Sequence, residues 1–267
     1  AHEEFSFKLF ATIIIVTLAS FVLAFWLLAP DALWSSHIHA GLGKFLLAVV
    51  VVVGANCFVE YVFHRYVLHK PVVPIFRYFF QSHHCVHHPH TRIVKRRVPS
   101  GKEIYFIEEI ENRYPIERPE QKEASFFPWY SLLVFGLLAT PFLVLLTLLI
   151  PSLPWFFAGY AGIALSLLLY EVFHAAEHLP LEKWIPLIEH KRWGRFLTKV
   201  YGFHLRHHAV VDCNEAISGF FLFPIADWIF GTCVVPETLY ADGESYDPKK
   251  FAVPIPFAVV ADNVIAE

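Results

Sequence analysis

Charged residues are scarce in this chain. Only 17% of its 267 residues are Asp, Glu, Lys or Arg, whereas 56% are hydrophobic. Soluble globular domains carry about 25% charged residues, so this composition excludes an ordinary soluble domain and favours a membrane protein. Methionine is absent altogether, and nothing in the sequence accounts for that.

Four apolar stretches lack any charge in their central parts, at residues 10–29, 44–63, 129–150 and 154–173. Each is long enough to cross the ~30 Å hydrocarbon core, which takes about 20 helical residues. The first stretch is too long for a signal peptide, has no basic region before it beyond Lys8, and lacks a small-residue cleavage site. We therefore expect four retained membrane spans.

Lys and Arg are also missing from two connections. Residues 30–43 and 151–154 contain neither, although Lys44 borders the first. Translocated loops are depleted in basic residues, so we predict two helical hairpins with both chain termini in the cytoplasm. The host membrane would be a bacterial inner membrane or the endoplasmic reticulum.

This pattern predicts an all-α membrane protein with four transmembrane helices and a cytoplasmic helical cap. The expected segments are 1–69 (tail and first hairpin), 70–128 (histidine-rich and charged), 129–178 (second hairpin) and 179–267 (cap and tail). Within the second segment the acidic run from Glu103 to Glu123 is interpreted as helical. The basic run at 91–97 favours anionic lipid headgroups over nucleic acid, because the sequence pI is near 6.6 and a span is adjacent.

Cysteine is rare as well, with four residues. Three of them are expected on the reducing cytoplasmic side and Cys57 inside a span, so disulfides are not expected. Cys85 lies among histidines and is a possible but less favoured metal ligand.

Histidine, by contrast, is concentrated. Ten of the sixteen histidines form one two-part motif that occurs twice. The first copy is H-x4-H followed by H-x2-HH, and the second is H-x3-H followed by H-x2-HH. Imidazole is the commonest protein ligand for transition metals, and ten ligands exceed the four of one tetrahedral zinc. The motif therefore predicts a dinuclear metal site, with these ligands: His64, His69, His84, His87, His88, His174, His178, His204, His207 and His208.

Helical spacing groups most of these side chains. Positions i, i+3 and i+4 share a face, so the two H-x2-HH triplets each point one way, as does the pair His174 and His178. His64 and His69 are about 140° apart on an α-helix, so the helix must end or bend between them, or they serve different metals. His83 and His90 are candidate outer-layer or substitute ligands. The four histidines outside the clusters (His2, His37, His39 and His190) are interpreted as structural.

Two carboxylates lie near the inner ends of their spans. Glu60 precedes His64 by four residues and Glu171 precedes His174 by three. Metal-bound imidazoles often donate their free N–H to a carboxylate, so these residues are candidate supports for His64 and His174, and Asn214 is a further candidate. The alternative is that each glutamate reaches the headgroups or pairs with an arginine such as Arg65.

Other functions remain open at this stage. His174-Ala-Ala-Glu177-His178 matches the H-x-x-E-H zinc-protease pattern, but that function leaves eight clustered histidines unused. A non-enzymatic haem protein would need histidines at mid-span, and a metal transporter would need polar groups through the bilayer. The spans have neither feature.

The order of the histidine motifs around four spans resembles the fatty acid hydroxylase / sterol desaturase superfamily of membrane di-iron oxygenases. The resemblance covers about residues 59–232 and includes Glu60-Tyr-Val-Phe-His64-Arg, Ala226-Asp-Trp-Ile-Phe-Gly-Thr232 and the ten histidines one by one. The fused b-type cytochrome domain of eukaryotic fatty acid 2-hydroxylases is missing, and the 103–123 insertion is foreign to the pattern. Both departures bear on the substrate.

The resemblance implies two bound iron ions, with zinc as a possible substitute, and O2 as co-substrate. The implied reaction is hydroxylation of an unactivated C–H bond in a membrane lipid, with lipid desaturation at the same site as the alternative. Because no redox domain is fused, it also implies a separate electron donor (b-type cytochrome, ferredoxin or reductase) on the cytoplasmic face.

Overall fold

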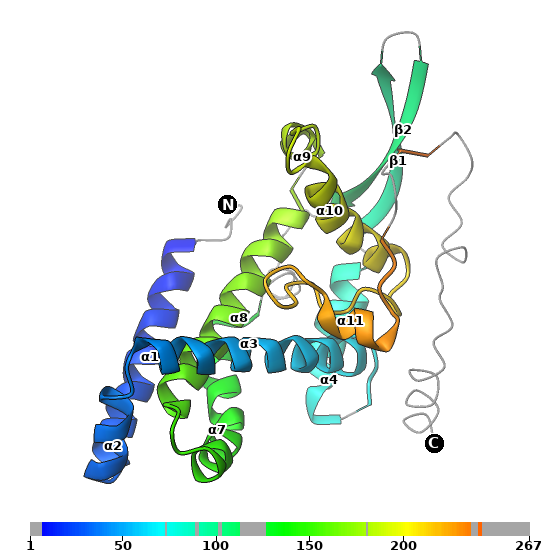
Figure 1. Cartoon of the computed structure of the whole chain (residues 1–267). Helices are drawn as coiled ribbons and strands as arrows, with labels where there is room; N and C mark the ends of the chain where they lie inside the picture. The colour runs from blue at the N-terminus through cyan, green and yellow to red at the C-terminus, as the bar shows by residue number, and fades with distance from the viewer. Residues whose placement is uncertain are drawn as a thin grey trace. The chain divides into compact units, whose positions relative to one another are not determined.

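The computed structural model describes residues 7–72, 74–88, 91–100, 103–112, 127–179, 181–235 and 240–241 (Figure 1). The chain divides into two compact units. The first unit comprises Ala1–Asn56 and Phe127–Glu171, and the second comprises Cys57–Phe126 and Val172–Glu267. Two long helices run from the first unit into the second: α3 (Leu42–Phe63), which ends just before His64, and α8 (Trp155–Glu177), which contains His174.

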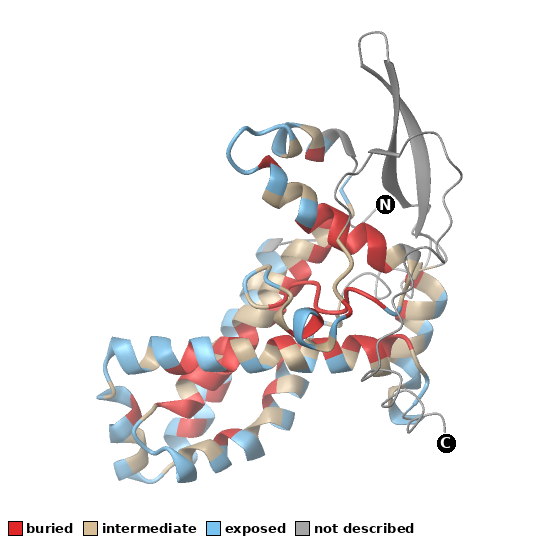
Figure 2. Cartoon of the chain, turned by 45° about the vertical axis from the view of Figure 1, so that its right-hand side comes forward, coloured by how far each residue is buried: buried red, intermediate tan, exposed pale blue. Residues whose placement is uncertain are grey.

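The prediction of four membrane-spanning helices is confirmed. They are α1 (Phe7–Leu28), α3 (Leu42–Phe63), α7 (Ser131–Leu149) and α8 (Trp155–Glu177), and each is long and apolar enough to cross a membrane. A short helix that was not predicted, α2 (Asp31–Ile38), begins after Pro30. Figure 2 shows many exposed residues along α1, α3 and α7, as expected for surfaces that face lipid rather than water.

The first unit packs around aromatic rings and small residues. Phe21 of α1 stacks on Tyr160 of α8 with ring centroids 4.3 Å apart. A Cβ added to Gly136 of α7 would lie 2.4 Å from the Phe21 ring, so this approach requires glycine. Helices in membranes associate through such close packing, because lipid tails provide no hydrophobic drive between them.

The α3 and α8 helices meet in the same way. A Cβ on Gly162 would lie 2.7 Å from Val52 Cγ1. Asn56 Nδ2 donates a hydrogen bond to Ser166 Oγ over 3.0 Å, which satisfies two polar groups inside the spans. These contacts fix the first unit's portions of the two helices against each other.

The second unit combines helices with a small sheet. Its helical elements, in chain order, are η1 (His64–Leu68), η2 (Pro74–Phe76), α4 (Arg77–Phe80), η3 (Gln81–His87), α9 (Leu181–Ile188), α10 (Gly194–Ala209) and α11 (Ile225–Phe230). One buried cluster joins the inner part of α3 to α11 through Cys57, Tyr61, Ala216 and Ala226.

The helical interpretation of Glu103–Glu123 was wrong for its first part. Strand β2 (Glu103–Asn112) pairs antiparallel with β1 (Thr91–Ser100), and β3 (Tyr240–Ala241) pairs with β2. The hairpin lies beside α10 (Figure 1). Its register runs from Thr91 opposite Asn112 to Ser100 opposite Glu103. The all-α prediction is therefore correct for the membrane-spanning helices, but the second unit also contains a three-stranded sheet.

Gly162→Val should destabilise the protein by about 1–3 kcal/mol, because the added atoms overlap Val52. Thermal unfolding of the detergent-solubilised chain measures the effect. Gly43→Ala is the matched control, since a Cβ at Gly43 meets nothing within 4 Å. Equal melting temperatures for the two variants would contradict the close packing of α3 on α8.

Candidate metal centre

All ten predicted ligands lie in the second unit. They come from the end of α3 with η1, from η3, from the end of α8 and from α10. Most of these rings are buried, and several are fully so. Segments that are distant in the sequence therefore bring their histidines into one volume.

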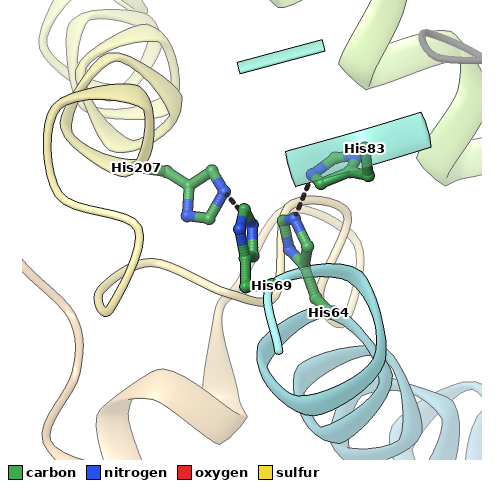
Figure 3. Close-up of side chains that lie close together, drawn as sticks. All are labelled: His64, His69, His83 and His207. Carbon is green, nitrogen blue, oxygen red and sulfur yellow. Dashed lines mark hydrogen bonds between the residues drawn. The ribbon is translucent and has the colours of Figure 1, made fainter. Parts of the chain in front are cut away.

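Four histidines form what we call the first group: His64, His69, His83 and His207. All four are buried, and one nitrogen from each lies within 4.8 Å of the others. His64 Nε2 is 3.0 Å from His83 Nε2, and His69 Nε2 is 3.1 Å from His207 Nε2 (Figure 3). Nitrogens that share one metal at 2.0–2.1 Å lie about 2.9–3.4 Å apart, so the donor set fits a metal ion.

A π-helical turn explains how His64 and His69 reach the same group. The segment η1 is a π-helix, and the His69 N–H donates to the His64 carbonyl over 3.2 Å. This i→i+5 bond places residues five apart on one face, whereas an α-helix would separate them. The predicted break in the helix is thus a change of helix type, which is frequent at functional sites.

The same effect exchanges the predicted roles of His83 and His84. The segment η3 is also π-helical, and the His88 N–H donates to the His83 carbonyl. His83 therefore joins the first group, whereas His84 is only part-buried and faces Nδ1 of His69 at 3.0 Å. His84 contacts Nδ1 of His69, the nitrogen that does not face His207. It would therefore support a ligand rather than bind the metal ion itself.

The second group is His87, His174, His178 and His208, whose nitrogens also lie within 4.8 Å of one another. His174 Nε2 is 3.2 Å from His178 Nε2. His204 adjoins the group, because its Nε2 is 3.0 Å from His178 Nε2 and 3.1 Å from His208 Nε2.

His88 connects the two groups. Its ring stacks on His208 with centroids 4.4 Å apart and lies 5.1 Å from the ring of His207. The two groups are therefore adjacent, and the predicted pair of metal positions agrees with the geometry.

The rings are held in the uncharged form. Burial lowers the pKa of His207 to about 4 and lowers the pKa of His69, His87, His178 and His204 well below the ordinary value, and neighbouring imidazoles add to the effect for most of them. A neutral imidazole carries the lone pair that binds a metal. The site is therefore ready to bind a cation at neutral pH.

Backbone carbonyls orient two rings of the first group. His64 Nδ1 donates to the Glu215 carbonyl over 2.6 Å, and His207 Nδ1 donates to the Cys213 carbonyl over 2.8 Å. Each ring thus has its proton on Nδ1 and its lone pair on Nε2, which faces the group. Neither acceptor could be predicted from the sequence, because every residue has a backbone carbonyl and no residue type marks the one that accepts.

A buried carboxylate accompanies the second group. Glu177 is 1% exposed and its Oε2 lies 3.5 Å from His204 Nδ1. In the sequence, Glu177 was singled out only as the base of the H-x-x-E-H protease pattern. Its position behind His204, whose ring adjoins the second group, is that of an orienting group.

Glu60, which was predicted to support His64, has other partners. Glu60 accepts hydrogen bonds from Ser218 N, Ser218 Oγ and Gly219 N, at 2.7, 2.7 and 3.1 Å. Both nitrogens of His64 are already engaged, with Glu215 and His83. The prediction that Glu60 supports His64 was therefore wrong.

The remaining candidate residues are Glu171, Asn214, Cys85 and His90. Glu171 accepts from the Phe127 N–H over 2.7 Å, and its pairing with His174 stays a prediction. Asn214 binds the Phe203 and Val234 carbonyls and so supports the backbone of α10. Cys85 is exposed and outside both groups. His90 lies outside the described residues.

Comparison with known proteins adds no assignment: no family model, no curated protein and no solved structure matches this chain.

The exchange of His83 and His84 can be tested by metal content. We expect two metal ions per purified wild-type chain, one in His83→Ala and two in His84→Ala, because only His83 offers a nitrogen to the first group. Elemental analysis of the detergent-solubilised chain gives the counts. Loss of an ion in His84→Ala, with both retained in His83→Ala, would restore the α-helical assignment.

Proposed function

We propose that this protein is a membrane-bound lipid hydroxylase that uses two iron ions and O2. The observation that carries the proposal is the pair of adjacent all-imidazole groups, built partly on the ends of two membrane-spanning helices, α3 and α8. The resemblance of the histidine motifs to the fatty acid hydroxylase / sterol desaturase superfamily supports the same function.

When bound, two iron ions would supply the oxidising power that breaks an unactivated C–H bond with O2 and two electrons. The chain's own residues hold the ions, keep the ligands neutral and exclude water. The first group is buried, and His64 and His207 are only 1% and 0% exposed. Exclusion of water protects a reactive centre from side reactions.

The substrate class follows from where the ligands are attached. His64 and His174 lie within the apolar segments 42–68 and 155–177 that are able to span a membrane. A lipid chain within the bilayer could therefore approach the groups without first crossing water. Desaturation of such a lipid by the same site is the second candidate reaction.

The protease alternative is less well supported. In zinc proteases of the H-x-x-E-H type the glutamate acts as base beside a three-ligand metal. Here His174 and His178 share a group with His87 and His208, and Glu177 lies behind His204. A non-enzymatic metal-binding protein is the alternative from another class, and the activity experiment below distinguishes it.

Activity should require O2 and a reductant. The iron-loaded chain, in vesicles of host lipid with a reductase chain and isotopically labelled O2, should place one labelled oxygen atom in a lipid, as read by mass spectrometry. His207→Ala should abolish the product, whereas His39→Ala, which removes an exposed histidine of the first unit, should not. Unlabelled desaturated lipid would favour desaturation, and hydrolysis without O2 would exclude an oxygenase.

Orientation in the membrane is a separate proposal. The electron donor must reach the second unit, and the distribution of Lys and Arg supports a cytoplasmic position for that unit. In a Cys85→Ser background, which removes the exposed native thiol, an impermeant thiol reagent added to intact cells should label Ser36→Cys but not Lys191→Cys. Both positions are exposed. The reverse pattern would place the histidines on the wrong side for a cytoplasmic donor.

A further inference from the structure

The segment Cys213–Ser218 between α10 and α11, which we call the acceptor loop, is buried although it is neither helix nor strand. Asn214 and Glu215 are 0% exposed, and Ala216 and Ser218 are 1% exposed. Buried backbone N–H and C=O groups need partners. The partners of this loop determine where its carbonyls point.

Asp227, in the first turn of α11, binds this loop with both carboxylate oxygens. Oδ1 accepts from the Glu215 N–H and Oδ2 accepts from the Ala216 N–H, each over 2.9 Å. The Thr232 hydroxyl donates to Oδ1 over 2.6 Å. Asp227 is itself 0% exposed, so its contacts are protected from competing water.

These bonds act directly on the ligand supports. Fixing the N–H groups of residues 215 and 216 fixes the two peptide planes on either side of residue 215. The second plane contains the Glu215 carbonyl, which accepts from His64 Nδ1 over 2.6 Å. Two residues earlier, the Cys213 carbonyl accepts from His207 Nδ1. The acceptor loop therefore orients two of the four rings of the first group, His64 and His207.

We propose that Asp227 is a positioning residue for the first group: it holds the acceptor loop so that His64 and His207 present Nε2 to a metal ion. The inference deepens the proposed function and rests on it only in requiring that the first group binds metal. The contacts of Asp227 do not involve the second group, and the ring that adjoins that group, His204, has a different neighbour, Glu177, so the effect of Asp227 should be selective.

The test measures binding of Zn²⁺ alone. The full-length chain, purified in detergent and stripped of metal, is titrated with Zn²⁺ in competition with a chromophoric chelator. Asp227→Asn replaces one acceptor oxygen with an NH2 group that faces a backbone N–H. We expect one of the two Zn²⁺ ions to bind about tenfold more weakly, as for other groups behind metal ligands, and the other to bind as in wild type.

Thr232→Val is the matched control. It removes the hydroxyl bond to the same carboxylate and leaves both backbone bonds to the loop. We expect a lower melting temperature of the metal-free protein with both Zn²⁺ affinities retained. This separates a general loss of stability from a loss of ligand orientation.

Glu177→Gln tests the converse. Because Glu177 lies against His204 beside the second group, we expect weaker binding of the other Zn²⁺ ion. Unchanged binding in Asp227→Asn, or equal weakening of both ions in parallel with the melting temperature, would overturn the inference while leaving the metal centre intact. A wild-type chain that binds fewer than two Zn²⁺ ions would overturn the inference and the proposed function together.

Discussion

The histidine groups of the second unit depend on one constraint: many imidazoles share a buried volume, so each must stay uncharged and turn a lone pair toward the place that a metal ion would occupy. Where two Nε2 atoms face each other at about 3 Å, as in His64 and His83, positive rings would repel strongly. The structure satisfies the constraint for His64 and His207 by giving each Nδ1 a backbone carbonyl. The helix ends, the π-turns and the acceptor loop all serve this arrangement.

Much of this could be predicted from the sequence. Hydrophobic length alone identified the four spans, and the repeated histidine motif identified seven of the ten proposed ligands that the two groups contain. Helical spacing failed for His83 and His84, whereas for His64 and His69 it predicted a break in the helix without its type. Both lie in π-turns, whose i→i+5 geometry no periodicity based on the α-helix reproduces.

The supports of the ligands could not be predicted for a different reason. Glu60 was assigned to His64 because they are one helical turn apart, yet its partners, Ser218 and Gly219, lie 158 and 159 residues later. The carbonyls of Cys213 and Glu215 belong to a loop whose path depends on tertiary contacts. The hairpin of β1 and β2 was missed because strand pairing joins two segments, and a run interpreted by itself does not reveal its partner strand.

Two buried acids lie against the histidines of the second unit. Glu177 and Glu215 are 1% and 0% exposed, and each has an oxygen within 4 Å of an imidazole ring, at His204 and His64. Burial raises the pKa of Glu215, and Arg65, at 3.2 Å, opposes that effect, so burial without a nearby cation favours the protonated form of Glu215. Divalent cations bound by the two groups would favour the charged form of both acids, so the acids fit the proposed metal centre.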